Sequence, residues 1–229
     1  AGLRGAVIKL GSKFADINQL ENNIIEVGGG TLDKMVSEFA RSHNIGDLEF
    51  LSCIPGSIGG AICMNSGCYG SDMSTILLSV KIMDRNGDEK EIKNNNIKFF
   101  YRDTNLPRDY IITSAKLQGR ELSKDLIEKK QKELIEKKKK TQPNQIKTCG
   151  STFKNQKNIK AWKLIKEAGC EKYYVGDAAI SSKHCNFFVN KGNAKASDIE
   201  RLIYKVKQEV KKKTGVDLDL EIKIIGNEK

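Results

Sequence analysis

The chain of 229 residues is poor in proline, tryptophan and histidine, with three, one and two of each. It also has no apolar run near the ~20 residues that a membrane-spanning helix needs. The first residues lack the basic-then-apolar pattern of a secretory signal. We therefore expect a cytoplasmic protein without a membrane partner, large enough for two modest lobes with cores of their own.

The cysteines lack the spacing of a metal site. No CxxC pair occurs, and no histidine stands at zinc-ligand distance from a cysteine along the chain, so we expect no metal. Free thiols are the ordinary state of cysteines in a reducing compartment. The six residues are Cys53, Cys63, Cys68, Cys149, Cys170 and Cys185.

Arginine is scarce in a chain whose net charge is +11. Lysine supplies nearly all of the positive charge, and the aromatic residues are not interleaved with basic ones as in proteins that bind single strands. The charge favours anionic ligands, phosphates included. We expect no nucleic-acid partner.

Glycine, in contrast, is concentrated between Leu48 and Gly70, in the string LEFLSCIPGSIGGAICMNSGCYG. Glycine allows backbone amides to approach a ligand closely and to adopt positive φ, so such a loop can hold phosphate oxygens or a flat ring. A turn-rich connection that binds nothing is the alternative. A second cluster, Gly28 to Gly30, is either another approach to the same ligand or a tight turn from strand to helix.

Hydrophobic periodicity predicts the regular elements. In the first half we expect strands at 6–10, 24–27 and 110–117, a helix over 32–40 that Thr31 caps, and a hairpin of 78–84 and 89–92 around Asn86-Gly87. In the second half we expect a solvated, lysine-rich helix over 121–140, helices at 161–168 and from Ser197 with a capping box to Glu200, a strand at 186–190, and a final strand in which Leu218, Leu220, Ile222 and Ile224 share one face.

Five segments in order carry a resemblance to one family. IPGSIGGAICMNSGCYG closely resembles the flavin-binding loop of the UDP-N-acetylenolpyruvoylglucosamine reductases (MurB), enzymes of peptidoglycan precursor synthesis. The others match that family's pattern nearly to the end of the chain: YRDT at 101–104, TQPNQIKTCGSTFKN at 141–155 with the AWKLIKEAGC that follows, VGDAAISSKHCNFFVNKGNAKASDIERLI at 175–203, and LEIKIIG at 220–226.

The resemblance implies an α+β fold with two lobes. Residues 1–118 would be a vanillyl-alcohol-oxidase-type FAD-binding lobe, 119–143 a connecting helix, and 144–229 the substrate-binding lobe of the family. The short connection between 117 and Pro143 is similar to the type II branch. Family members carry, ahead of the position of Gly2, a segment ending in a GxGSN loop that grips the FAD diphosphate, so we expect the 229 residues alone to be amino-terminally incomplete and to hold FAD poorly.

The family's reaction assigns roles to individual residues. NADPH reduces a bound FAD, and the flavin reduces the enolpyruvyl ether of a UDP-sugar to the lactyl ether, UDP-N-acetylmuramate. The resemblance makes Arg102 and Glu221 stabilisers of the enolate-like state and Ser151 the proton donor, with Tyr101, Lys154 and Asn155 on the substrate. It places FAD on Gly28, Gly30, Ile54, Pro55, Gly56, Ser57, Gly59, Gly60, Asn65, Gly67 and Tyr69.

The sequence departs from the family pattern at four positions. Gln156 stands for a usual proline, Asp177 for glycine, Thr104 for serine and Cys68 for alanine. Two other functions stay open. One is a non-catalytic, truncated remnant of the reductase, which flavin absorbance of the protein would test. The other is a different flavin oxidoreductase that shares the first lobe, although it would not predict GSTFKN or the closing LEIKIIG.

Overall fold

The computed structural model describes residues 3–156 and 159–226. It divides into two compact units, each with a hydrophobic core: an N-terminal unit, Val7–Lys138, and a C-terminal unit, Lys139–Lys229 with Ala1–Ala6. Within the described ranges, no helix is long and apolar enough to cross a membrane.

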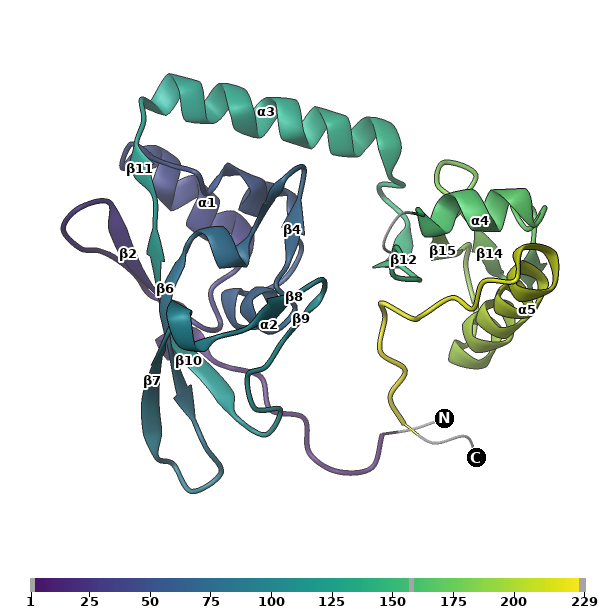
Figure 1. Cartoon of the computed structure of the whole chain (residues 1–229), viewed down its shortest axis with the longest axis horizontal. Helices are drawn as coiled ribbons and strands as arrows, with labels where there is room; N and C mark the ends of the chain where they lie inside the picture. The colour runs from purple at the N-terminus through teal and green to yellow at the C-terminus, as the bar shows by residue number, and fades with distance from the viewer. Residues whose placement is uncertain (1–2, 157–158, 227–229) are drawn as a thin grey trace. The chain divides into compact units, whose positions relative to one another are not determined.

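An antiparallel sheet of five strands, in the order β1-β2-β10-β6-β7, forms the frame of the N-terminal unit (Figure 1). The hairpin predicted around Asn86-Gly87 is confirmed, and Gly87 has the positive φ of 90° that its turn requires. The strands are β1 (Ile17–Gln19), β2 (Ile24–Gly28), β6 (Leu77–Met83), β7 (Glu89–Lys93) and β10 (Ile111–Gln118).

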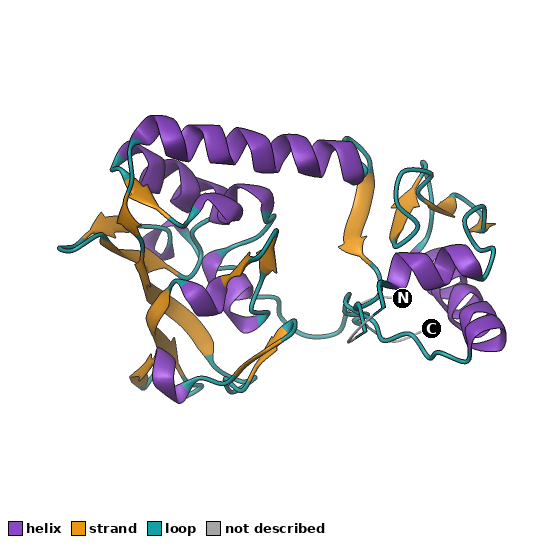
Figure 2. Cartoon of the chain, turned by 45° about the horizontal axis from the view of Figure 1, so that its top comes forward, coloured by secondary structure: helices purple, strands orange, loops and turns teal. Residues whose placement is uncertain are grey.

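Three α-helices belong to this frame: α1 (Asp33–Ser42), α2 (Ile58–Cys63) and α3 (Lys124–Thr141). The short helix α2 packs against β2 and β10. Helices α1 and α3 lie side by side (Figures 1 and 2). A hydrogen bond joins them, in which Gln131 Nε2 of α3 donates to Ser37 O of α1 at 2.9 Å. The predicted charged helix is confirmed and is mostly solvent-exposed, with Ile127 and Gln131 buried.

Short elements connect the main ones. Residues 6–10 form no strand in the described chain, so the strand predicted there is wrong. Val7 and Ile8 are 77% and 78% exposed, because apolar side chains without a neighbouring strand have no sheet to pack on. The short elements are η1 (Ser12–Phe14), β3 (Ile45–Gly46), η2 (Glu49–Cys53), β4 (Gly67–Cys68), β5 (Ser71–Asp72), η3 (Met73–Thr75), η4 (Asn94–Asn96), β8 (Phe99–Phe100), β9 (Asp103–Thr104) and β11 (Arg120–Glu121).

The C-terminal unit is an antiparallel sheet in the order β12-β15-β14-β13 with two helices. Its strands are β12 (Lys147–Ser151), β13 (Tyr174–Val175), β14 (Ala178–Ile180) and β15 (Phe187–Asn190), and its helices are α4 (Ala161–Glu167) and α5 (Ala196–Thr214). Helix α5 packs on α4, β13 and β14. It begins before the predicted capping box, and the Asp198 carboxylate accepts from Lys195 N at 2.9 Å.

The strand predicted at the carboxyl end is also wrong. In the described chain only Leu220 pairs there, in an isolated bridge to Phe153. Leu218 is fully buried, whereas Ile224 and Ile225 are 48% and 72% exposed. The alternation predicted from sequence therefore places Leu218 correctly, but it cannot supply the continuous partner that a strand needs.

Candidate functional site

Two glycine-rich segments of the N-terminal unit are joined by main-chain hydrogen bonds. Gly29 donates to Thr113 O at 2.8 Å, and its own carbonyl accepts from Gly59 N at 2.9 Å. Asp33 N donates to Gly56 O at 3.1 Å. The turn after β2 and the predicted flavin loop thus form one continuous surface over β10.

Close packing of the backbone explains why glycine is needed in the first segment. A Cβ on Gly28 would lie 2.1 Å from Phe14 O, and one on Gly29 would lie 2.1 Å from Ile112 O. Real Cβ atoms do not approach other atoms this closely, so the turn has a structural requirement for glycine whatever it binds. Gly56 has φ 150°, which an L side chain rarely adopts.

Polar atoms without partners lie where these segments meet. Among the described residues, Thr31 Oγ1 and both carboxylate oxygens of Asp33 are buried without a hydrogen bond. Burial raises the pKa of the Asp33 carboxyl to about 7. Buried polar groups are normally satisfied, so these atoms fit a place that a polar ligand completes. These residues therefore fit a polar, uncharged part of a cofactor.

Neither residue was predicted in this role. Thr31 was interpreted as the cap of the following helix, yet α1 begins at Asp33 and no side-chain hydrogen bond caps it. Asp33 is typical of a first helical turn, where an acidic side chain is ordinary. The carboxyl is fully buried, and Gly56 packs beside it, since an added Cβ on Gly56 would lie 3.4 Å from Asp33 Oδ2.

A hairpin brings the predicted arginine to the flavin loop. Tyr101 and Arg102 form the turn between β8 and β9, and Arg102 has φ 58°. Its Nη2 donates to Gly67 O at 3.2 Å, and its guanidinium lies 5.1 Å from the centre of the Tyr101 ring. Asn65 Nδ2 donates to Phe100 O at 3.3 Å. Four predicted site residues are therefore held together within this unit.

The remaining predicted flavin contacts lie on the same loop, except Gly30, which lies on the turn after β2. Tyr69 lies beneath Lys137 Nζ, 4.8 Å from the ring centre. Ser57 precedes α2 and pairs with Leu32 in an isolated bridge. Gly30 N donates to Phe14 O at 2.8 Å, Ile54 packs against the core, and Pro55 and Gly60 are exposed.

In the C-terminal unit, Ser151 and Glu221 lie on neighbouring segments. Ser151 ends β12, directly after Gly150, whose φ is 86°. Glu221 N donates to Thr152 O at 2.9 Å, and Lys154 N donates to Asp219 O at 2.8 Å. The structure thus brings these two predicted residues together, while Arg102 belongs to the N-terminal unit.

A side-chain amide that was not predicted holds the serine segment. Asn186 is 3% exposed, its Oδ1 accepts from Phe153 N at 3.0 Å, and its Nδ2 donates to Phe153 O at 2.8 Å. Asn186 O also accepts from Thr152 N at 2.8 Å. Asn155 Oδ1 accepts from Ala161 N at 3.1 Å at the start of α4. The segment that follows Ser151 is therefore fixed at both faces of its backbone.

Comparison with known proteins reveals the family. Residues 1–93 match an FAD binding domain, and residues 142–225 match the C-terminal domain of UDP-N-acetylenolpyruvoylglucosamine reductase. The reductase of Pelagibacter ubique (strain HTCC1062) is 47% identical over 224 residues, which cover 96% of this chain and 74% of the relative. That of Wolbachia pipientis wMel is 43% identical, covering 99% and 77%. The chain belongs to the UDP-N-acetylenolpyruvoylglucosamine reductase family.

A solved structure of the same family agrees. The crystal structure of UDP-N-acetylenolpyruvylglucosamine reductase from Thermus caldophilus has a TM-score of 0.79 and 34% identity, covering 86% of this chain and 71% of that one. The predicted family, the α+β fold with an FAD-binding lobe first, and the FAD cofactor are thereby confirmed. The roles of individual site residues and the lobe boundaries at 118 and 144 stay predictions.

Two departures from the reductase family pattern have defined contacts. Gln156 Nε2 donates to Asp217 O at 2.8 Å, which ties its turn to the segment before Glu221. Asp177 Oδ2 accepts from Asn193 N at 2.8 Å. Each polar side chain replaces a rigid or small residue and gains a hydrogen bond, so both turns are stabilised locally.

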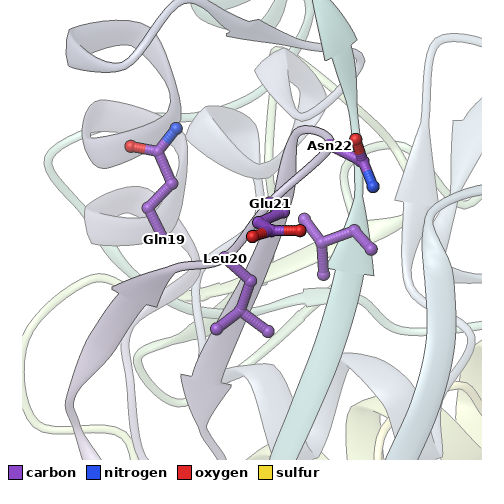
Figure 3. A pocket seen from close by; sticks show the side chains of 5 residues that line it. Gln19, Leu20, Glu21 and Asn22 are labelled. Carbon is purple, nitrogen blue, oxygen red and sulfur yellow. The ribbon is translucent and has the colours of Figure 1, made fainter.

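An open hollow beside the turn between β1 and β2 contains none of the reductase-family site residues. Figure 3 shows the side chains of Gln19, Leu20, Glu21 and Asn22 around it, and Ile24 completes the lining. Among the described residues, its lining includes the Glu21 carboxylate and no cationic side chain. We assign it no anionic ligand.

Proposed function

We propose that this protein reduces the enolpyruvyl ether of UDP-N-acetylglucosamine to UDP-N-acetylmuramate with FAD and NADPH. The observation that carries the proposal is the match of nearly the whole chain to UDP-N-acetylenolpyruvoylglucosamine reductases, with 47% identity to that of Pelagibacter ubique. The reaction adds one hydride and one proton across a carbon–carbon double bond. Its nucleotide substrates belong to the cytoplasm, where we place the protein.

When bound, FAD accepts a hydride from NADPH and supplies it to the substrate. The glycine-rich turn after β2 and the loop 54–70 are the segments that would hold it. Thr31 and Asp33 would contribute the polar atoms that are buried without a partner among the described residues. The protonated form of Asp33, about half of the population at pH 7 because burial raises its pKa to about 7, can donate a hydrogen bond to a cofactor oxygen or nitrogen.

The other residues act on the charge that develops in the substrate. Hydride addition to the terminal carbon leaves negative charge on the carbon beside the carboxylate. Arg102 binds that carboxylate and, with Glu221, stabilises the enolate-like state. Ser151 supplies the proton to the same carbon. A serine hydroxyl is a weak acid, so this step needs a neighbouring cation or an oriented water.

Separate measurement of the two half-reactions tests these roles. In the FAD-supplemented protein, Ser151→Ala should leave flavin reduction by NADPH unchanged and slow reoxidation by the enolpyruvyl substrate about 100-fold, the scale for loss of a positioned acid. Arg102→Ala should both weaken substrate binding and slow the same half-reaction, because the arginine contacts the carboxylate in ground and transition states.

A neighbouring variant provides the control. Cys149→Ser changes an exposed side chain on the same strand as Ser151 and should leave both half-reactions within about twofold. A Ser151→Ala protein that reoxidises at the parent rate would remove Ser151 as the donor. Failure of the parent to reduce the enolpyruvyl substrate, with FAD and NADPH present, would contradict the proposed function itself.

A further inference from the structure

Two cysteines stand at the two ends of the predicted flavin loop. Cys53 ends η2 and Cys68 ends β4, so they bracket residues 54–67. Both belong to the N-terminal unit, where η2 and β4 pack against one another. The other four cysteines lack this placement. Cys63 and Cys149 are exposed, and Cys170 and Cys185 belong to the C-terminal unit.

The side chains of the two cysteines meet. Cys68 Sγ donates to Phe50 O at 3.6 Å. In a 3-10 helix the carbonyl of one residue points toward the amide three residues on, so Phe50 O faces the amide of Cys53. The Cys68 sulfur is therefore at the turn that carries Cys53, near enough for each thiol to affect the pKa of the other.

Positive charge and hydrogen bonds prepare Cys53 for reaction. The neighbouring Cys68 thiol lowers the pKa of the Cys53 thiol against the effect of burial, and the Ser52 hydroxyl at 3.8 Å and Lys138, whose Nζ donates to Cys53 O at 2.8 Å, act in the same direction. The Cys53 side chain is 6% exposed. A lowered pKa favours the nucleophilic thiolate, and at this burial the sulfur is accessible only to a small oxidant.

Cys68 has the opposite character while Cys53 is a thiolate. Hydrogen bonding to Cys53 raises the pKa of the Cys68 thiol, with burial adding to the effect. Once the Cys53 sulfur has reacted and lost its negative charge, it no longer raises the pKa of the Cys68 thiol. One thiol is thus suited to react first and the other to resolve the product.

We propose that Cys53 and Cys68 form a reversible disulfide that closes the loop 54–67. With hydrogen peroxide as oxidant, the Cys53 thiolate attacks one oxygen, giving a sulfenic acid and hydroxide. The Cys68 sulfur then attacks the Cys53 sulfur, the S–S bond forms, and the sulfenic oxygen leaves as water. In total two thiols lose two protons and two electrons, and one peroxide becomes two waters.

The bond would restrict the loop that contains Gly56, Ser57 and Gly59. A cross-link over a short loop reduces the conformational freedom of the unfolded chain, so the oxidised protein should melt about 5 °C or more above the reduced one. The disulfide is a property of the chain itself and does not depend on the proposed reductase activity.

Peroxide treatment of the full chain, followed by alkylation and mass spectrometry, tests the proposal. We expect two of the six thiols to be lost together, chymotryptic fragments around Met64 to be joined between Cys53 and Cys68, and dithiothreitol to reverse the change. Cys63→Ser is the matched control on the same loop and should keep the bond. Cys53→Ser and Cys68→Ser should each abolish it together with the rise in Tm.

Three results would overturn the proposal. One is a peroxide-treated protein that keeps all its thiols. Another is a bond that includes Cys63. The third is a Cys53 that proceeds to sulfinic acid while Cys68 remains reduced, since the geometry requires that the second thiol intercept the sulfenic acid.

Discussion

The two units hold their predicted site residues by different means. In the N-terminal unit, main-chain bonds from Gly29, Gly30 and Gly59 fix the loops, and glycine is required by close backbone approach. In the C-terminal unit, the buried side chain of Asn186 adds its hydrogen bonds to the main-chain bonds that hold the segment after Ser151. The first site is built by the backbone and is sensitive to an added Cβ, whereas the second is also sensitive to the loss of one side chain.

The largest expected effect is on the backbone-built site. Gly29→Ala places a Cβ 2.1 Å from Ile112 O, so the strand and turn must separate. We expect a loss of about 3 kcal/mol in the free energy of unfolding, at the upper end for overpacking. Gly11→Ala, at a glycine with no atom within 4 Å of the added Cβ, is the control and should change stability little. Denaturant unfolding would compare them, and equal midpoints would show that the turn relaxes freely.

Asn186→Ala tests the two hydrogen bonds from the Asn186 side chain to Phe153. It leaves the buried amide and carbonyl of Phe153 without their side-chain partner, and we expect a loss of about 2 kcal/mol in the free energy of unfolding. Asn193→Ala, at an exposed position on the loop before α5, should cost less than about 0.5 kcal/mol. Thermal unfolding measures both. If the two variants have the same Tm, the hydrogen bonds of the Asn186 side chain contribute nothing to stability.

A buried carboxyl makes the N-terminal unit sensitive to pH. Because the folded pKa of Asp33 is raised to about 7 from 3.8, the unfolded chain loses its proton first as pH rises. Stability at this group therefore falls between about pH 4 and pH 7 and stays low above. The difference in stability between pH 5 and pH 8 is about two pK units, so Asp33→Asn should raise Tm by about 5 °C more at pH 8 than at pH 5. Asp88→Asn, at an exposed turn, should show no such difference. A gain from Asp33→Asn that is independent of pH would contradict the burial of an ionising group.

The smallest effect concerns the lysines at the end of α3. Lys137 contacts the Tyr69 ring at 4.8 Å, a cation–π pair worth about 0.5–1 kcal/mol at an exposed site. Lys137→Gln should therefore change FAD affinity by no more than about threefold, and Lys129→Gln, earlier on the exposed helix, should not change it. Fluorescence titration with FAD measures both. A tenfold loss for Lys137→Gln would show that this side chain takes a direct part in the site.

Sequence predicted the elements whose signal is local. The Asn86-Gly87 hairpin, the helix later found as α4 and the charged helix α3 carry their turn residues, stop signals and periodicity within one stretch of chain. The strands predicted at 6–10 and 218–224 failed for the opposite reason. A strand exists only with a partner strand, and the alternation of apolar and polar residues does not tell which segment that partner is.

The same distinction applies to the site. Arg102, Ser151 and Glu221 were found because their motifs resemble a family's, and they remain predictions until the half-reactions are measured. Asn186 was missed because its amide acts on Phe153, 33 residues away. The burial of Asp33 and the proximity of Cys68 to the turn that carries Cys53 were missed because both arise only on folding.

Asn65, Tyr69 and Arg102 all have positive φ, at 38°, 55° and 58°. At each position glycine would adopt the observed backbone with less strain, by roughly 1 kcal/mol. At Asn65 the side chain offsets this strain, because Oδ1 accepts from Ser74 N at 3.1 Å and Nδ2 donates to Phe100 O at 3.3 Å, and each hydrogen bond is worth about 1 kcal/mol. A selection for heat resistance alone should therefore keep asparagine at 65. Glycine gained at Tyr69 or Arg102 would remove the ring or the guanidinium, so such a selection needs a simultaneous measure of activity.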